Sequence, residues 1–153
     1  MPPSYRGKSR AGIPLPERYG ISGSEDSEQI RLFMWAALPD TQKLYPELRW
    51  MFAIPNGGFR HKREGGKLKA MGVKAGVPDI MLPIRRGKWP GIVIELKRPT
   101  IKAKKQRAGE VRENQKPWII HFLSQGYGAV VCVGWEPARD VLIEYLKNGA
   151  NYE

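Results

Sequence analysis

The chain has 153 residues, of which 41% are hydrophobic and 27% charged, so its length and composition are those of one globular domain rather than of a disordered polymer. One cysteine, Cys132, and two histidines exclude an intramolecular disulfide and the usual structural zinc site, and they favour a reducing, cytoplasmic location. No apolar run reaches the roughly 20 residues that span a bilayer, and the N-terminus lacks the apolar core of a secretory signal.

The formal net charge of +11 favours a polyanionic partner, with nucleic acid first and an anionic membrane surface second. Part of this charge lies in residues 1–23, which are rich in Pro, Gly, Ser and Arg and show no periodicity. We therefore expect a flexible basic N-terminal arm over residues 1–23 and a single domain over residues 24–153.

The first predicted helix follows this arm. Ser22 and Ser24 are candidates for its N-cap, and Pro39 should end it. Between them, apolar residues recur at helical spacing, namely Ile30, Phe33, Met34, Ala37 and Leu38. Glu28 lies at the flank of this apolar stripe, where the helix dipole alone would favour a first-turn carboxylate.

Three strands are predicted next, at residues 50–54, 80–84 and 92–97. The connections between them are a turn at 55–58, a short basic helix at 65–71 that Gly72 should stop, and a loop at 85–90. A helix from Gln115 to Leu123, a buried strand at 129–133 and a last helix opening at Glu136 complete the order. Because a helix joins the third strand to the fourth, those two should be parallel neighbours, in a mixed sheet with helices on both faces.

The strand at 92–97 carries the strongest chemical signal. Side chains alternate along a strand, so Glu95 and Lys97 should share one face, about 6.6 Å apart, while Ile92, Ile94 and Leu96 take the other.

Asp79 should face this strand. Paired residues in a hairpin have a constant sum of residue numbers, and with Gly87 as the pivot Asp79 falls opposite Glu95, with Cβ atoms roughly 4.5–5.5 Å apart. A bulge or a slip of one residue would break this pairing.

Two carboxylates at that separation repel when both are ionised. A raised pKa, a neutralising lysine or a bound divalent cation would each relieve the repulsion. The oxygens of Asp79 and Glu95, with a backbone carbonyl, suit Mg²⁺ or Mn²⁺. Such a site next to Lys97 could activate water against a phosphodiester, the natural substrate of so basic a chain.

The Glu-x-Lys motif alone more often marks a solvated pair on a polar face. Basic residues stand on either side of it in sequence, although each run alone more often is a solvated face or loop. Those before it are Arg60, Lys62, Arg63, Lys67, Lys69 and Lys74, and those after it are Arg98, Lys102, Lys104, Lys105 and Arg107.

Taken together, these residues resemble the VRR-NUC family of the PD-(D/E)xK nuclease superfamily, from about Glu28 to about Leu146. The resemblance is carried by Asn56-Gly57-Gly58, Arg60, the run from Met71 through Pro78-Asp79, Ile94-Glu95-Leu96-Lys97, Gln115 and Gly126-Tyr127. It implies a restriction-endonuclease-like α/β fold with an αβββαβ core, which the element order reaches independently.

The resemblance also implies roles for particular residues. Asp79 and Glu95 match the metal-binding acids of the family, and Leu96 would provide its backbone carbonyl. Lys97 matches the catalytic lysine. Gln115 matches the helix glutamine near the metal, and Glu28 matches the acid of the first helix that holds a metal-bound water. The sequence departs from the family before Gln115, where Arg112-Glu113-Asn114 stands in place of a frequent Ser or Thr cap. The expected contacts to DNA are Asn56, Gly57, Arg60, Lys62, Arg63, Lys67, Lys74, Arg98, Lys102, Lys104 and Lys105.

The activity implied is that of a Mg²⁺- or Mn²⁺-dependent, structure-selective endonuclease acting on branched DNA such as four-way junctions, with no membrane partner. Two symmetric cuts need two sites, which a two-fold homodimer supplies. The alternatives are a basic nucleic-acid binding module without catalysis, a nuclease for flaps, single strands or RNA, and a basic adaptor that binds a protein at its sheet edge.

Other motifs do not support a different chemistry. Gly65-Gly66-Lys67-Leu68 lacks the spacing of a nucleotide-binding loop, and Cys132 fits a buried apolar position rather than a nucleophile. Trp35, Trp89, Tyr127 and Trp135 could line a dimer interface, but core packing is the more common role of such residues.

Overall fold

A computed structural model describes residues 23–55 and 62–148 of the chain. Its elements in chain order are α1 (Glu25–Ala36), α2 (Pro39–Leu44), the 3₁₀ helix η2 (Pro46–Trp50), β1 (Phe52–Ala53), α3 (Lys62–Ala70), β2 (Ile80–Leu82), β3 (Ile92–Lys97), the 3₁₀ helix η3 (Lys102–Lys104), α4 (Lys116–Ser124), β4 (Gly128–Val133) and α5 (Trp135–Asn148). No helix in these ranges combines the length and the apolar character needed to cross a membrane.

The predicted arm lies outside the described residues except for Gly23. Gly23 is buried; its N–H donates to Ser27 Oγ at 3.0 Å and its carbonyl accepts from Gln106 Nε2 at 2.7 Å. The folded part therefore includes the last residue of the range 1–23.

The four strands form one mixed sheet in the order β1-β2-β3-β4. β2 pairs antiparallel with both β1 and β3, and β3 pairs with β4 in parallel. The core order of one helix, three strands, a helix and a strand confirms the predicted αβββαβ arrangement and the parallel final pair.

The register between β2 and β3 is the one predicted for a hairpin with its pivot at Gly87. Ile80 pairs with Ile94 and Leu82 with Ile92. Gly87 has a φ of +54°, a conformation that glycine adopts without a Cβ penalty. The hairpin closes through the bridge between Arg86 and Trp89, so the turn is centred between Gly87 and Lys88 and not on Gly87 as predicted.

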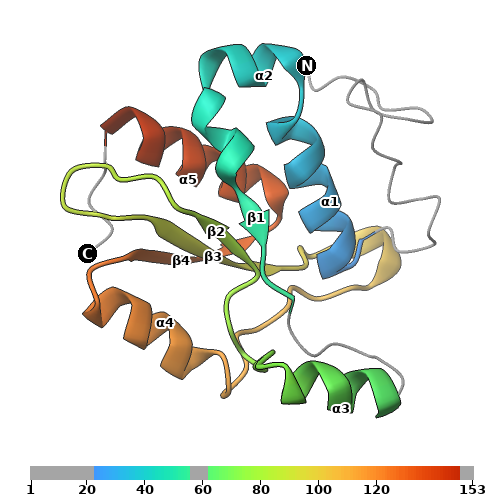
Figure 1. Ribbon diagram of the computed structural model, residues 1–153. Helices are drawn as coiled ribbons and strands as arrows, with labels where there is room; N and C mark the ends of the chain where they lie inside the picture. Colours follow the sequence, from blue (N-terminus) through green and yellow to red (C-terminus); the bar gives the residue numbers. More distant parts are fainter. Residues whose placement is uncertain (1–22, 56–61, 149–153) are drawn as a thin grey trace.

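Helices cover both faces of the sheet (Figure 1). α1 and α5 pack against each other and against β3 on one face, and α4 packs against β4 on the other. The face of β3 toward α1 and α5 is apolar as predicted, because Ile92, Ile94 and Leu96 lie in the core cluster with Leu32 and Leu142. The opposite face of β3 is left to carry Glu95 and Lys97.

Several element bounds differ from the sequence expectation, and the strand predicted at 80–84 contains only Ile80–Leu82. The strand predicted at 50–54 contains only Phe52–Ala53, because the chain from Pro46 to Trp50 forms a 3₁₀ helix. The basic helix begins at Lys62 rather than at residue 65, and Gly72 follows it with a φ of +96°. Pro39 ends α1 as predicted but also begins α2, where its missing N–H costs nothing.

The aromatic side chains and the cysteine serve the core. Trp89 is 5% exposed, and Trp35 and Trp135 pack against the core cluster. Burial raises the pKa of Cys132 to about 11, so its thiol stays protonated at neutral pH. The predicted burial of Cys132 is confirmed.

Candidate active site

The start of β2 places Asp79 against β3. Its Oδ2 accepts a hydrogen bond of 2.7 Å from the Leu96 N–H, and its carbonyl accepts one of 2.8 Å from the Ile54 N–H. Continuing the β2–β3 register by one pair sets Asp79 opposite Glu95. Because the N–H and C=O of a strand residue point to the same edge, the Leu96 carbonyl points to the edge where Asp79 lies.

Glu95 and Lys97 lie on the same face of β3, as their alternation predicts, and each is only 1% exposed. Lys97 Nζ is 3.0 Å from Glu95 Oε1 and donates to Gln115 Oε1 at 2.9 Å. Lys and Glu are almost never this buried unless they are paired, so their contact is the reason that both are tolerated here.

Gln115 joins this pair from the start of α4. Its Nε2 donates to Glu95 Oε1 at 2.7 Å, and its Oε1 accepts from Lys97 Nζ and, at 2.8 Å, from the Arg112 N–H. The two donors at one end and the carboxylate at the other fix the orientation of the amide. Gln115 thus occupies the N-cap position of α4 without capping it, because its side chain is directed to Glu95 and Lys97.

The environment of Glu95 favours its neutral form. Burial raises the pKa of Glu95, the charge of Asp79 raises it further, and Lys97 partly offsets both, which brings it from 4.5 to about 7. The second carboxylate oxygen, Oε2, is buried and has no hydrogen-bond partner within residues 23–55 and 62–148. A buried acceptor without a donor is costly, so Glu95 retains an unused ligand position.

The first helix brings a different acid to Lys97 from the one that the sequence singled out. Glu25 Oε1 lies 3.6 Å from Lys97 Nζ, whereas Glu28 Oε2 accepts a 2.8 Å hydrogen bond from the Trp135 N–H, the first residue of α5. Glu28 therefore caps α5, and its expected role in holding a metal-bound water stays a prediction.

Glu25 was missed because α1 carries three acids in its first turn, and all three fit the helix dipole equally well. The helix starts at Glu25 because the Ser24 side chain accepts from the Ser27 N–H, which turns this first acid toward β3. Gly109 was also missed. A Cβ there would lie 3.0 Å from Glu25 Oε1 and 3.4 Å from Lys97 Cδ, so its lack of a side chain leaves room for the pair.

The donor atoms fit a divalent cation of the hard type. Asp79 and Glu95 offer carboxylate oxygens, Glu95 Oε2 lacks a partner, and the Leu96 carbonyl points to the same edge. The described ranges contain no group of three or more His, Cys, Asp and Glu side chains able to hold a metal. Two carboxylates and a carbonyl leave several positions to water, which is how Mg²⁺ is usually bound.

The predicted DNA-contacting residues fall into three groups. Asn56, Gly57 and Arg60 lie outside the described residues. Lys62 and Arg63 belong to α3, and their side chains are outside the described part as well. The remaining six are exposed, namely Lys67, Lys74, Arg98, Lys102, Lys104 and Lys105.

Comparison with known proteins finds a matching family and a similar solved structure. The VRR-NUC domain family matches residues 58–135, which include Asp79, Glu95, Lys97 and Gln115. A solved structure described as a VRR_NUC domain protein is 30% identical, and the match covers 81% of this chain and 88% of that chain with a TM-score of 0.63. No curated protein matches the chain. The mixed four-stranded sheet flanked by helices is accordingly the restriction-endonuclease-like fold.

Proposed function

The chain belongs to the VRR-NUC family of nuclease domains, and from this premise we propose that it is a Mg²⁺- or Mn²⁺-dependent endonuclease that hydrolyses phosphodiester bonds in branched DNA. The observation that carries the proposal is the cluster of Asp79, Glu95, Lys97 and Gln115. It combines hard oxygen ligands, an ammonium group and an unpartnered buried carboxylate oxygen in one place.

Asp79, Glu95 and the Leu96 carbonyl would hold the cation. When bound, it would supply Lewis-acid polarisation of a phosphoryl oxygen and lower the pKa of a ligated water. Binding at Glu95 would also favour the ionised carboxylate, which burial and Asp79 disfavour in its absence.

Lys97 is the group of this site that can donate to the reacting atoms. Its Nζ carries three protons and contacts Glu95 Oε1 and Gln115 Oε1. In the reaction it would orient the attacking water and stabilise the charge that develops on the phosphate. Gln115 hydrogen-bonds to both Lys97 and Glu95 and so fixes their relative positions. Glu25, on α1, partly neutralises the charge of the Lys97 ammonium group.

Branched DNA is proposed as the substrate because of symmetry and charge. A chain with one such cluster makes one cut, and two symmetric cuts across a four-way junction require a two-fold homodimer. The net charge of +11 supports binding through backbone phosphates, which positions DNA without reading its sequence.

A cleavage assay on a synthetic four-way junction tests the proposal. We expect cleavage with Mg²⁺ or Mn²⁺ and none with EDTA. Glu95→Ala and Lys97→Ala should each reduce the rate by about 10²- to 10³-fold or more while still binding the junction, and Lys43→Ala, a lysine of α2, is the matched control.

The substrate is identified by comparing cleavage rates on the junction with those on flaps, linear duplexes, single strands and RNA at equal concentration. Faster cleavage of any of these than of the junction would contradict the choice of branched DNA. A protein that binds all of them and cleaves none with any divalent cation would be a basic binding module, and the enzymatic proposal would be wrong.

A further inference from the structure

A hollow of about 370 Å³, within the range of small-ligand pockets, is lined by residues that are near in sequence to Asp79 and Gln115. We call it the Trp118 pocket, and Asp79, Glu95, Lys97 and Gln115 together are the acidic cluster. The wall of the pocket is mostly apolar, with one lysine, and the lining residues that matter here are Ile54, Met71, Val73, Lys74, Val77 and Trp118. The contacts described for Asp79, Glu95 and Lys97 do not involve its side chains.

The Trp118 pocket is tied to the acidic cluster through the backbone. Its residue Ile54 donates its N–H to the Asp79 carbonyl at 2.8 Å. Val77 precedes Asp79 by two residues, and Trp118 follows Gln115 by three. These short connections place the pocket near the acidic cluster.

The shape of the pocket is fixed by close backbone packing at Gly76, where the segment before β2 contacts the segment that leads into α4. A Cβ on Gly76 would lie 2.1 Å from the Asn114 carbonyl oxygen and 3.3 Å from Trp118 Cδ1, and its φ is +87°. The indole of Trp118 is further supported by Phe122, with ring centroids 6.5 Å apart. Such a preformed aromatic wall loses little entropy when a ligand binds.

The chemistry of the wall selects its ligand. Met71 is 70% exposed, so an apolar side chain stands at the rim in contact with solvent, and Lys74 beside it is exposed as well. A flat, weakly polar group attached to a phosphate would cover the apolar wall and pair with the lysine. In a chain of charge +11, a nucleobase on its sugar–phosphate backbone has this combination.

We propose that the Trp118 pocket receives one unstacked nucleobase adjacent to the phosphodiester at the acidic cluster, with Trp118 and Met71 contacting the base and Lys74 the neighbouring phosphate. This rests on the proposed function and extends it by naming the local structure recognised, an unpaired nucleotide. Stacked bases inside a duplex cannot enter such a pocket without unpairing, whereas a branch point or single strand supplies a free base.

Binding without metal tests the pocket separately from catalysis. In EDTA, fluorescence anisotropy would compare a thymidine oligonucleotide with an abasic oligonucleotide of the same number of phosphates. The wild type should bind the thymidine strand about 5- to 150-fold more tightly, as one base–aromatic stack would give. Lys74→Gln should weaken binding of both strands alike and leave their ratio unchanged.

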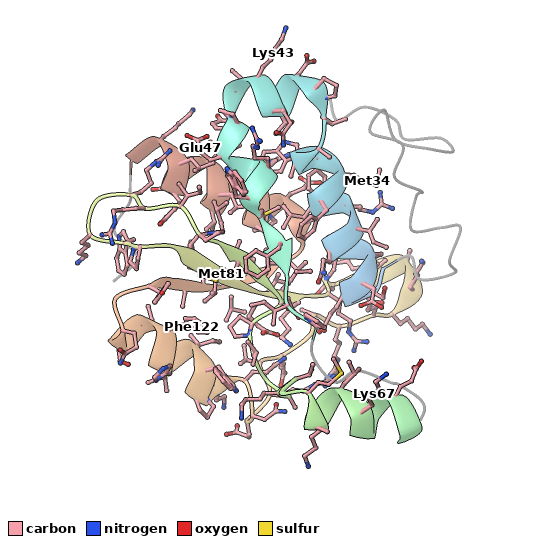
Figure 2. The ribbon with its side chains drawn as sticks, viewed as in Figure 1. Met34, Lys43, Glu47, Lys67, Met81 and Phe122 are labelled. Atoms are coloured by element: carbon pink, nitrogen blue, oxygen red, sulfur yellow. The ribbon has the colours of Figure 1, made fainter. Side chains whose placement is uncertain are left out.

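Two variants remove the base contact. Trp118→Leu keeps an apolar side chain but no ring and should bring the ratio of affinities close to 1. Met71→Ala should lower the ratio about fourfold, the value of roughly one buried methylene, and its exposed position makes it harmless to folding. Leu44→Ala is the matched control, because Leu44 is 72% exposed and lies on α2, which Figure 2 shows at the opposite end of the molecule from α3.

A ratio near 1 in the wild type, or an unchanged ratio in Met71→Ala and Trp118→Leu, overturns the pocket assignment. Base-dependent binding by a protein that never cleaves DNA would support the pocket assignment and contradict the proposed nuclease activity. Cleavage without base-dependent binding would support the nuclease activity and contradict the pocket assignment.

Discussion

Replacement of Glu95 by glutamine should stabilise the metal-free protein at alkaline pH and change it least in acid. The pKa of Glu95 is raised from 4.5 to about 7, first by burial and then by the charge of Asp79. A carboxyl whose pKa is raised by folding contributes stability that is fully present below its unfolded pKa. This contribution is lost as the pH rises through the folded pKa. Glutamine has the same shape and cannot ionise.

The size of the effect follows from those two pKa values. Each unit between them is worth about 1.4 kcal/mol, so ionising Glu95 costs the folded chain about 3 kcal/mol at pH 8. The advantage of Glu95→Gln over the wild type should therefore grow by about 3 kcal/mol from pH 4 to pH 8. In a domain of this length that is about 6–12 °C in Tm.

Thermal or urea unfolding in EDTA at both pH values measures this difference, and ionisable groups common to both proteins cancel. Glu113→Gln is the control, since the side chain of Glu113 is 89% exposed and its pair with Lys116 should contribute little. If the stability advantage of Glu95→Gln over the wild type is equal at pH 4 and pH 8, or larger at pH 4, the assigned ionisation of Glu95 is wrong.

Three further outcomes are expected from the same structure. Gly76→Ala should lower the free energy of unfolding by more than about 2 kcal/mol, because the φ of +87° and the Asn114 carbonyl 2.1 Å from the added Cβ both disfavour a side chain there. Gly65→Ala lies in open space on α3 and should instead raise the free energy of unfolding by about 0.5–1 kcal/mol. Urea titrations of the two variants and the wild type measure both changes. Glu28→Ala should cost about 0.5–2 kcal/mol of stability through loss of the cap on the Trp135 N–H. A metal-dependent cleavage rate that falls far more than stability does would support the expected role of Glu28 at the metal site. Junction affinity in EDTA should fall with salt at a log–log slope of about −0.9 for each phosphate neutralised, and a flat salt dependence would exclude binding through the basic residues.

The sequence predicted β3 and its pairing well because local rules govern both. Strict alternation fixed which face carries Glu95 and Lys97. The constant sum of residue numbers gave the register that sets Asp79 opposite Glu95, although the turn is centred between Gly87 and Lys88 and not on Gly87. The position of Gln115 beside them could be expected only from the resemblance to the family, since it depends on how α4 packs on the sheet.

Tertiary contacts decided what the sequence could not. The acids of the first turn of α1 are equivalent in the pattern, and only the packing of α1 against β3 and α5 directs Glu25 to Lys97 and Glu28 to Trp135. The Trp118 pocket has no sequence signal, because its wall joins residues from three separate segments of the chain. The strand predicted at residue 50 is short because a 3₁₀ helix that begins at Pro46 occupies part of it.

Calorimetric titration with Mn²⁺ at pH 8 tests the central claim most directly, since it asks whether two carboxylates from adjoining strands hold a cation beside a buried ammonium group. We expect one ion per wild-type chain, with Asp79→Asn and Glu95→Gln each binding Mn²⁺ at least about tenfold more weakly and Glu113→Gln binding it as the wild type does. Wild-type protein that takes up no Mn²⁺, or both variants binding it as tightly as the wild type, would contradict the account.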